Sequence, residues 1–64
     1  MKAGLYRYKG NLYLLIGLTR EHHSDKEWIA YVPLRIEPGW TGPRIALREP
    51  EEFNRLFEYV GERL

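Results

Sequence analysis

The sequence predicts a small, mainly β domain of about four to five short strands followed by a C-terminal α-helix. The chain has 64 residues, which leaves room for one hydrophobic core and therefore one domain. Short runs of alternating apolar and polar residues, bracketed by glycine and proline, fill the first three quarters of the chain. Helical spacing of apolar residues occurs only near the end. We therefore expect strands within about residues 4–48 and a helix over about residues 50–60, with no linker between them.

The first element is a β-hairpin. Residues 5–9 alternate and are rich in strand-favouring aromatics. Residues 12–20 are too rich in strand-favouring residues, and too tightly bracketed, for a helix. Between them Gly10 and Asn11 both tolerate positive φ, so we place the turn there. Gly17 lies inside the second strand, where a glycine is typical of a bulge or a sharp bend.

Two further strands follow a polar loop over residues 21–26. In residues 27–35 the odd and even positions are both partly apolar, which indicates a central strand whose far end is disrupted by Pro33. Residues 36–43 hold two prolines, two glycines and Trp40 and form an irregular connection. Residues 44–48 alternate again, and we expect Ile45 and Leu47 to point inward.

The predicted helix begins at Pro50, which suits a first turn, and Glu51 and Glu52 complement its positive dipole end. Its apolar residues follow i, i+3, i+4, i+7 spacing and should face the sheet: Phe53, Leu56, Phe57 and Val60. Gly61 would end the helix as its C-cap. Short bent strands with a terminal helix favour an SH3-like, partly open barrel as the most economical closure for this length.

Composition restricts the function classes. There is no cysteine, which excludes disulfides, thiolate metal sites and cysteine nucleophiles and fits a reducing, cytoplasmic setting. The longest apolar run is too short to span a bilayer, and the N-terminal residues lack the apolar region of a signal peptide. The net charge is +1, yet residues 1–20 hold four cations and no acid, whereas residues 49–64 hold five acids against two arginines.

Candidate chemistry is sparse. His22, His23 and Asp25 carry metal-ligating groups, but neighbouring side chains on a loop point apart, and no further histidine or cysteine exists to complete a zinc site. Glu51 and Glu52 point about 100° apart on a helix, which does not suit paired acid–base work. The sequence therefore predicts no catalytic residue, no metal site and no cofactor.

Binding residues are more plausible. Aromatics interleaved with cations near the N-terminus could stack bases and neutralise phosphates, although the same tyrosines could line the core. Trp40 could be a contact residue for a protein partner or a lid on the core, and strand edges could support self-association. The candidate partner-binding residues are Tyr6, Arg7, Tyr8, Lys9, Arg20, Tyr31, Trp40 and Arg48.

Part of the chain resembles a known family. The residues that carry the resemblance are Gly4 to Tyr13 (GLYRYKGNLY), Ile16-Gly17, Arg20, Tyr31 with Leu34, and Leu47-Arg48 followed by Phe53. Over residues 4–53 this pattern resembles the bacterial family called domain of unknown function 1653. The family has histidines where this chain has Tyr8 and Glu21, and a tryptophan at Ala46. The resemblance implies an SH3-type barrel and brings no established activity or ligand.

The preferred interpretation is a non-enzymatic, cytoplasmic binding module that contacts a protein partner or a second copy of itself through the barrel surface. The alternative is nucleic-acid binding through the basic and aromatic N-terminal hairpin. Protein contact predicts that Trp40, Tyr31 or a strand edge carries the affinity, with weak dependence on salt. Nucleic-acid binding predicts that Arg7, Lys9 and Arg20 carry it, with affinity that falls steeply in salt.

Overall fold

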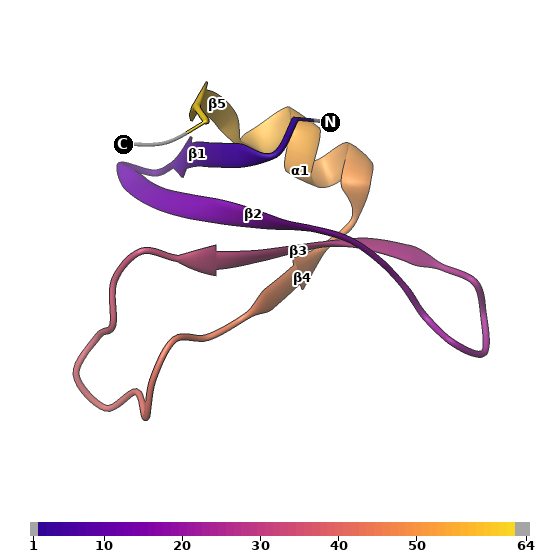
Figure 1. Ribbon diagram of the computed structural model, residues 1–64, viewed down its shortest axis with the longest axis horizontal. Coiled ribbons are helices and arrows are strands. Elements are labelled where there is room, and N and C mark those ends of the chain that lie inside the picture. The colour runs from indigo at the N-terminus through magenta and orange to yellow at the C-terminus, as the bar shows by residue number, and fades with distance from the viewer. Residues whose placement is uncertain (1, 63–64) are drawn as a thin grey trace.

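The computed structural model describes residues 2–62, which form one antiparallel sheet of five strands and a short helix (Figure 1). The elements in chain order are β1 (Gly4–Tyr8), β2 (Asn11–Arg20), β3 (Glu27–Pro33), β4 (Ala46–Arg48), α1 (Pro50–Leu56) and β5 (Glu58–Gly61). The strands lie side by side in the order β4-β3-β2-β1-β5. The predicted mainly β class is confirmed, and the barrel stays partly open because β4 and β5 do not pair.

The β1–β2 hairpin forms as predicted, but its turn lies one residue earlier. Tyr8 pairs with Asn11, so the two central turn residues are Lys9 and Gly10, with φ of 51° and 79°. A two-residue turn with positive φ at both central positions matches the right-handed twist of the strands. Asn11 begins β2 and its side-chain amide donates to the Lys9 carbonyl at 3.5 Å.

The bend expected at Gly17 is present. The register of β2 against β3 shifts between Leu15 and Gly17, which is the signature of a bulge. The ten-residue β2 can therefore pair with β1 along its first half and with β3 along most of its length. β3 is central, between β2 and β4, as the pattern of residues 27–35 predicts.

The predicted helix over residues 50–60 is too long. α1 ends at Leu56 because Phe57 adopts extended backbone, with φ −100° and ψ 140°, and residues 58–61 become β5, which pairs with β1. Gly61 pairs with Leu5 and is not a helix cap, and Val60 is exposed. Backbone groups of β5 thus form hydrogen bonds with β1, where a longer helix would have formed them within itself.

The core lies between α1 and the concave face of the sheet. It consists of the buried residues Tyr6, Leu15, Ile29, Tyr31, Phe53 and Phe57. Phe53 and Phe57 stack with ring centroids 4.1 Å apart, and Phe53 is 0% exposed. One turn of helix thus delivers two aromatic rings into a core otherwise made by the strands.

The inward face of β4 differs from the prediction. Ile45 and Leu47 are 68% and 54% exposed, whereas Ala46 pairs with Tyr31 and packs against the core. Side chains of a strand alternate between the two faces of the sheet, so choosing the odd instead of the even residues as core-facing puts every side chain on the wrong face. The register to β3 sets that choice, because Ile29 and Tyr31 are the core-facing residues there.

Burial of Tyr6 predicts alkaline destabilisation. Burial, and then the neighbouring Tyr59, raise the pKa of Tyr6 above its ordinary 10.0, opposed by the hydrogen bond that Tyr6 donates to the Lys2 carbonyl. The folded state therefore holds this proton more tightly than the unfolded state does, so its stabilising contribution is present below about pH 10 and is lost as pH rises through the raised pKa. Urea unfolding between pH 8 and 11 should show stability falling above pH 10. The fall should be shallower in Tyr6→Phe, and identical slopes would contradict this assignment.

Candidate binding surfaces

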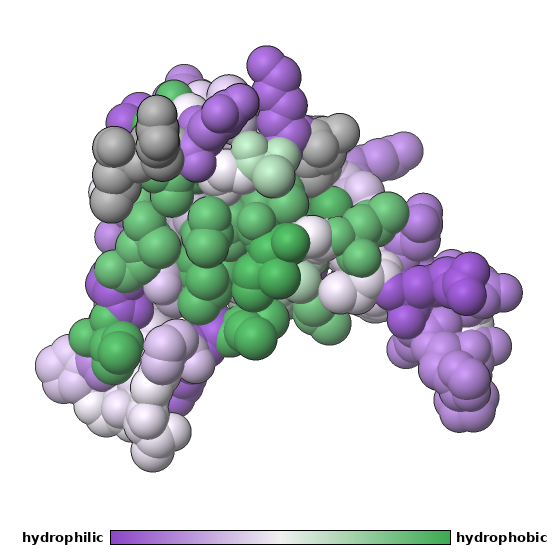
Figure 2. All heavy atoms as spheres, in the orientation of Figure 1, coloured by the Kyte–Doolittle hydropathy of each residue, from purple (hydrophilic) through white to green (hydrophobic). Residues whose placement is uncertain are grey.

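The face of the sheet turned away from α1, here called the outer face, is apolar. Leu14 pairs with Val32, and Ala30 pairs with Leu47; these pairs alternate with the core-facing residues, so they lie on the opposite side of the sheet. Leu14, Leu34 and Leu47 are exposed there. Figure 2 shows a broad hydrophobic area across the middle of the molecule.

A shallow hollow of about 320 Å³ lies at one end of the outer face. Its lining includes Thr19, Trp28 and Leu47. Trp28 is half-buried, pairs with Thr19 and has the Lys26 ammonium 4.4 Å from its ring centroid. Sequence reasoning placed Trp28 on an apolar strand face but did not single it out as a contact residue.

At the β1–β5 edge the outer face carries an ion pair. Arg7 pairs in register with Glu58, and Arg7 Nη1 donates to Glu58 Oε1 at 3.1 Å. Both side chains remain more than half exposed, so this ion pair adds little stability. Arg7 nevertheless has a carboxylate partner, which reduces its value as a phosphate contact.

A second surface gathers cations around aromatic rings on the concave side of the sheet. We call it the arginine–aromatic surface, and its members are Tyr8, Lys9, Tyr13, Arg35, Trp40, Arg44 and Arg48. The Arg44 guanidinium lies 4.8 Å from the Trp40 ring centroid. The Arg35 guanidinium lies 6.0 Å from the rings of both Trp40 and Tyr13, which joins the loop after β3 to β2.

The other end of this surface is built on Tyr8 and Arg48. The Arg48 guanidinium lies 5.6 Å from the Tyr8 ring, and the Lys9 ammonium lies 5.3 Å from the same ring. Arg48 also donates to the Tyr31 hydroxyl at 3.2 Å and to the Glu52 carboxylate. The bond to Tyr31, and then the bond to Glu52, raise the pKa of Arg48 above its ordinary value against the opposing effect of burial. Its charge is therefore fixed.

The structure separates the candidate residues predicted from sequence. Tyr6 and Tyr31 are buried in the core and are not available to a partner. Arg20, at the far end of β2, lies 3.5 Å from Asp25. Only four of the candidates come together, on the arginine–aromatic surface: Tyr8, Lys9, Trp40 and Arg48.

Sequence reasoning did not identify Arg35 and Arg44 as site residues. Both flank the irregular segment that carries Trp40, and that proximity along the chain is the one signal that could have indicated them. Tyr13 belonged to the aromatic and cationic set seen in the sequence, and the structure places its ring against Arg35.

The histidine loop shows no metal geometry. His22 and His23 are exposed, with ring centroids 4.9 Å apart, and Ser24 donates to Glu21. Among residues 2–62, no group of three or more histidine, cysteine, aspartate or glutamate side chains is arranged to hold a metal ion.

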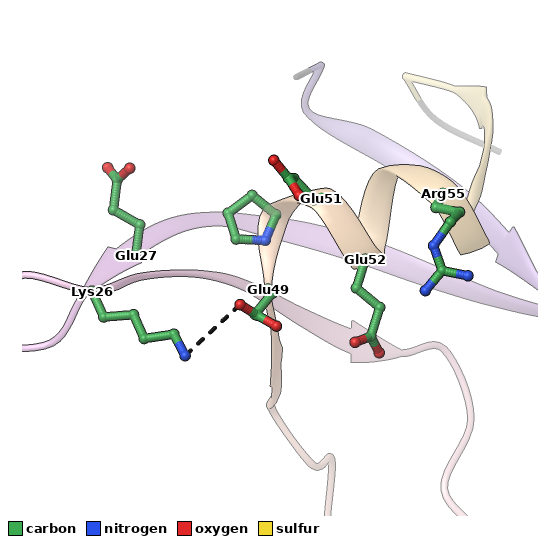
Figure 3. Close-up of a pocket in the computed structure, with 7 residues that line it drawn as sticks. Lys26, Glu27, Glu49, Glu51, Glu52 and Arg55 are labelled. Carbon is green, nitrogen blue, oxygen red and sulfur yellow. Dashed lines mark ion pairs between the residues drawn. The ribbon is translucent and has the colours of Figure 1, made fainter.

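A pocket of about 600 Å³ lies beside the start of α1 and is open and strongly charged. Lys26 Nζ lies 3.8 Å from Glu49 Oε2. In Figure 3 the Glu27 and Glu51 carboxylates point upward, whereas the Glu52 carboxylate points downward. The acids therefore do not converge on one point. This arrangement does not form an acid–base pair.

Comparisons with family models, curated proteins and solved structures find no match to this chain. The resemblance to domain of unknown function 1653 therefore stays a prediction. Within the described part of the chain, no helix has the length and apolar character needed to cross a membrane.

Proposed function

We propose that this chain is a non-enzymatic, cytoplasmic binding module of the SH3-like type that associates with a second copy of itself through the outer face of its sheet. The observation that carries the proposal is the exposed apolar area built on β2, β3 and β4. The SH3-like assignment is supported by the five-stranded antiparallel sheet, by the bulge in β2 and by the short helix that precedes a last strand pairing with the first. The cytoplasmic setting is supported by the absence of cysteine.

An exposed apolar sheet face is costly for a monomer. Soluble monomers rarely expose contiguous apolar patches above a few hundred Å², and here neighbouring strands present Leu14, Leu34 and Leu47 together. Their side chains stand on a regular sheet, so a partner sheet could pack against them at about 10 Å, as the two layers of a β-sandwich do. Covering this face would remove apolar area from water and favour association.

A second copy suits this face better than a charged partner does. The centre of the face carries leucine, valine and alanine. Charged side chains at its margins are paired, Arg7 with Glu58 and Lys26 with Glu49. Two identical faces would therefore meet without burying an unpaired charge, which is the condition for a favourable two-fold contact.

Replacing Leu47 by aspartate should abolish the association, because the new carboxylate would lie in the centre of the contact without a partner. Leu18→Asp is the matched control: Leu18 is 58% exposed, against 54% for Leu47, but pairs with the core-facing Ile29 on the other side of the sheet. Sedimentation velocity should give a dimer for the wild type and for Leu18→Asp and a monomer for Leu47→Asp.

Two outcomes would contradict the proposal. The first is a wild-type chain that stays monomeric up to about 1 mM, where even a contact of about −4 kcal/mol would be populated. The second is equal dissociation of both variants, which would place the contact elsewhere. Circular dichroism of each variant would show that the fold is retained.

A further inference from the structure

We propose that the arginine–aromatic surface binds single-stranded nucleic acid. This binding would be separate from self-association, because the surface lies on the concave side of the sheet, opposite the outer face. It differs from a site on the N-terminal hairpin alone, since Arg7 and Arg20 are excluded from it and Arg35 and Arg44 are included.

The charge of this surface suits a polyanion. The surface holds four cations, Lys9, Arg35, Arg44 and Arg48. Glu37 pairs with Arg35 at 3.2 Å and Glu52 pairs with Arg48, whereas Lys9 and Arg44 form no ion pair with any residue from 2 to 62. Two cationic side chains at opposite ends of the surface are thus available for phosphates, and their contacts would release counterions.

The aromatic rings of this surface suit unstacked bases. Tyr8 stacks on the buried Phe57 at 4.7 Å, and Tyr13 meets the edges of Tyr31 and Phe57 at 5.6 and 5.3 Å. Both tyrosines are half-buried, so each is fixed by the core and partly accessible. Rings held in this way lose little conformational freedom when a base stacks on them.

The rings and guanidinium groups also form a continuous series. From Trp40 the contacts run to Arg35, to Tyr13, to Phe57 and to Tyr8, at 6.0, 6.0, 5.3 and 4.7 Å. Nucleic-acid bases stack on aromatic rings and on guanidinium planes alike. Phe57 is buried, so the partly exposed members of the series, Trp40, Arg35, Tyr13 and Tyr8, offer the stacking positions. A guanidinium that lies over a ring keeps its in-plane N–H groups for phosphate oxygens.

This combination favours a single strand over the other polyanions. A duplex hides the faces of its bases inside the stack and could use only the cations. An acidic peptide would likewise engage Lys9 and Arg44 but has no flat groups for Tyr8, Tyr13 and Trp40. Unstacked bases alone use both features.

The test is fluorescence anisotropy with a labelled mixed-sequence single strand of about 12 nucleotides, a length within the roughly 4–16 nucleotides that one OB-fold covers. RNA and DNA versions, the matching duplex and labelled poly-glutamate serve as probes, each at low and near-physiological salt. The single strands should bind, and raising the salt concentration should lower the affinity. Lys9→Ala/Arg44→Ala should reduce affinity at least about tenfold and lower the salt slope by about 1.4, as expected for two lost phosphate contacts.

Arg7→Ala/Arg20→Ala is the matched control, because it removes the same charge from the same chain at residues outside the surface. It should retain affinity within about threefold, whereas Trp40→Ala should lower affinity with little change in the salt slope. The proposal is overturned if no single strand binds at low salt, if both double variants lose affinity equally, or if the duplex or poly-glutamate binds as tightly as the single strand. Binding by Leu47→Asp separates this site from self-association.

Discussion

Phe53→Ala should leave much of the chain unfolded at 25 °C. Among residues 2–62, Phe53 is the one large side chain that is fully buried. It contacts Tyr6, Tyr31 and Phe57 with ring centroids 5.0, 5.4 and 4.1 Å away. Replacing a buried phenylalanine by alanine costs about 3–5 kcal/mol. A chain of 64 residues has a total stability of only about 3–10 kcal/mol. The loss should also free α1, because Phe53 fixes that helix to the sheet.

Urea unfolding followed by circular dichroism measures this effect. Two variants serve as controls: Phe53→Leu keeps most of the buried volume and should cost much less, and Asn54→Ala changes the next, exposed helix position and should cost under about 1 kcal/mol. A Phe53→Ala chain whose unfolding midpoint matches that of Asn54→Ala would show that the core does not depend on this ring.

Local sequence signals predict the β-hairpin, the bend at Gly17, the central strand and the start of α1, because each depends on residues close together in the chain. Positive φ at Gly10 and alternation over residues 27–35 need no knowledge of the rest of the fold. The helix start follows in the same way from Pro50 and the acidic residues after it.

The C-terminal segment could not be predicted in this way. Phe53, Phe57 and Val60 fit a helical stripe, yet Phe53 and Phe57 would face the core in either arrangement. What decides the conformation of residues 58–61 is pairing with β1, more than fifty residues earlier in the chain. Helical periodicity contains no information about such a distant partner, so the sequence pattern predicts a last turn of helix where the structure has β5.

The same limit applies to the binding surfaces. Which residues of β4 face the core depends on its register with β3, which the sequence of β4 alone does not contain. Alternation therefore predicts Leu47 inside, whereas the structure places it on the outer face. Arg35 and Arg44 reach Trp40 only because the loop between β3 and β4 folds back on itself. Residue types indicated that cations and aromatics would matter, and tertiary structure decided which of them meet.

The two proposed surfaces lie on opposite sides of one sheet, and this arrangement has a consequence for affinity. Two copies joined through their outer faces would each keep an arginine–aromatic surface directed away from the contact. A nucleic-acid strand long enough to reach both arginine–aromatic surfaces would then bind more tightly than either surface alone allows. Longer strands should therefore favour the wild type over Leu47→Asp, whereas short strands should bind both equally.

Gly4→Ala should detach β5 from the sheet. A Cβ at position 4 would lie 2.5 Å from the Gly61 carbonyl oxygen and 3.1 Å from the Glu62 Cα, and these are backbone atoms that cannot rotate away. The φ of Gly4 is +132°, a conformation that alanine rarely adopts. Clash and strain act together, so we expect a loss of about 3 kcal/mol or more, at the upper end of what single substitutions cause.

Gly10→Ala separates the two causes. Gly10 also has positive φ, at 79°, but a Cβ there meets nothing within 4 Å, so it should show the strain alone, about 1 kcal/mol. Amide hydrogen exchange then locates the damage: Gly4→Ala should lose protection first at the β1–β5 pairs, while the β2–β3 pairs stay protected. Equal losses of stability in the two variants would mean that the close approach of β5 to Gly4 does not constrain the fold.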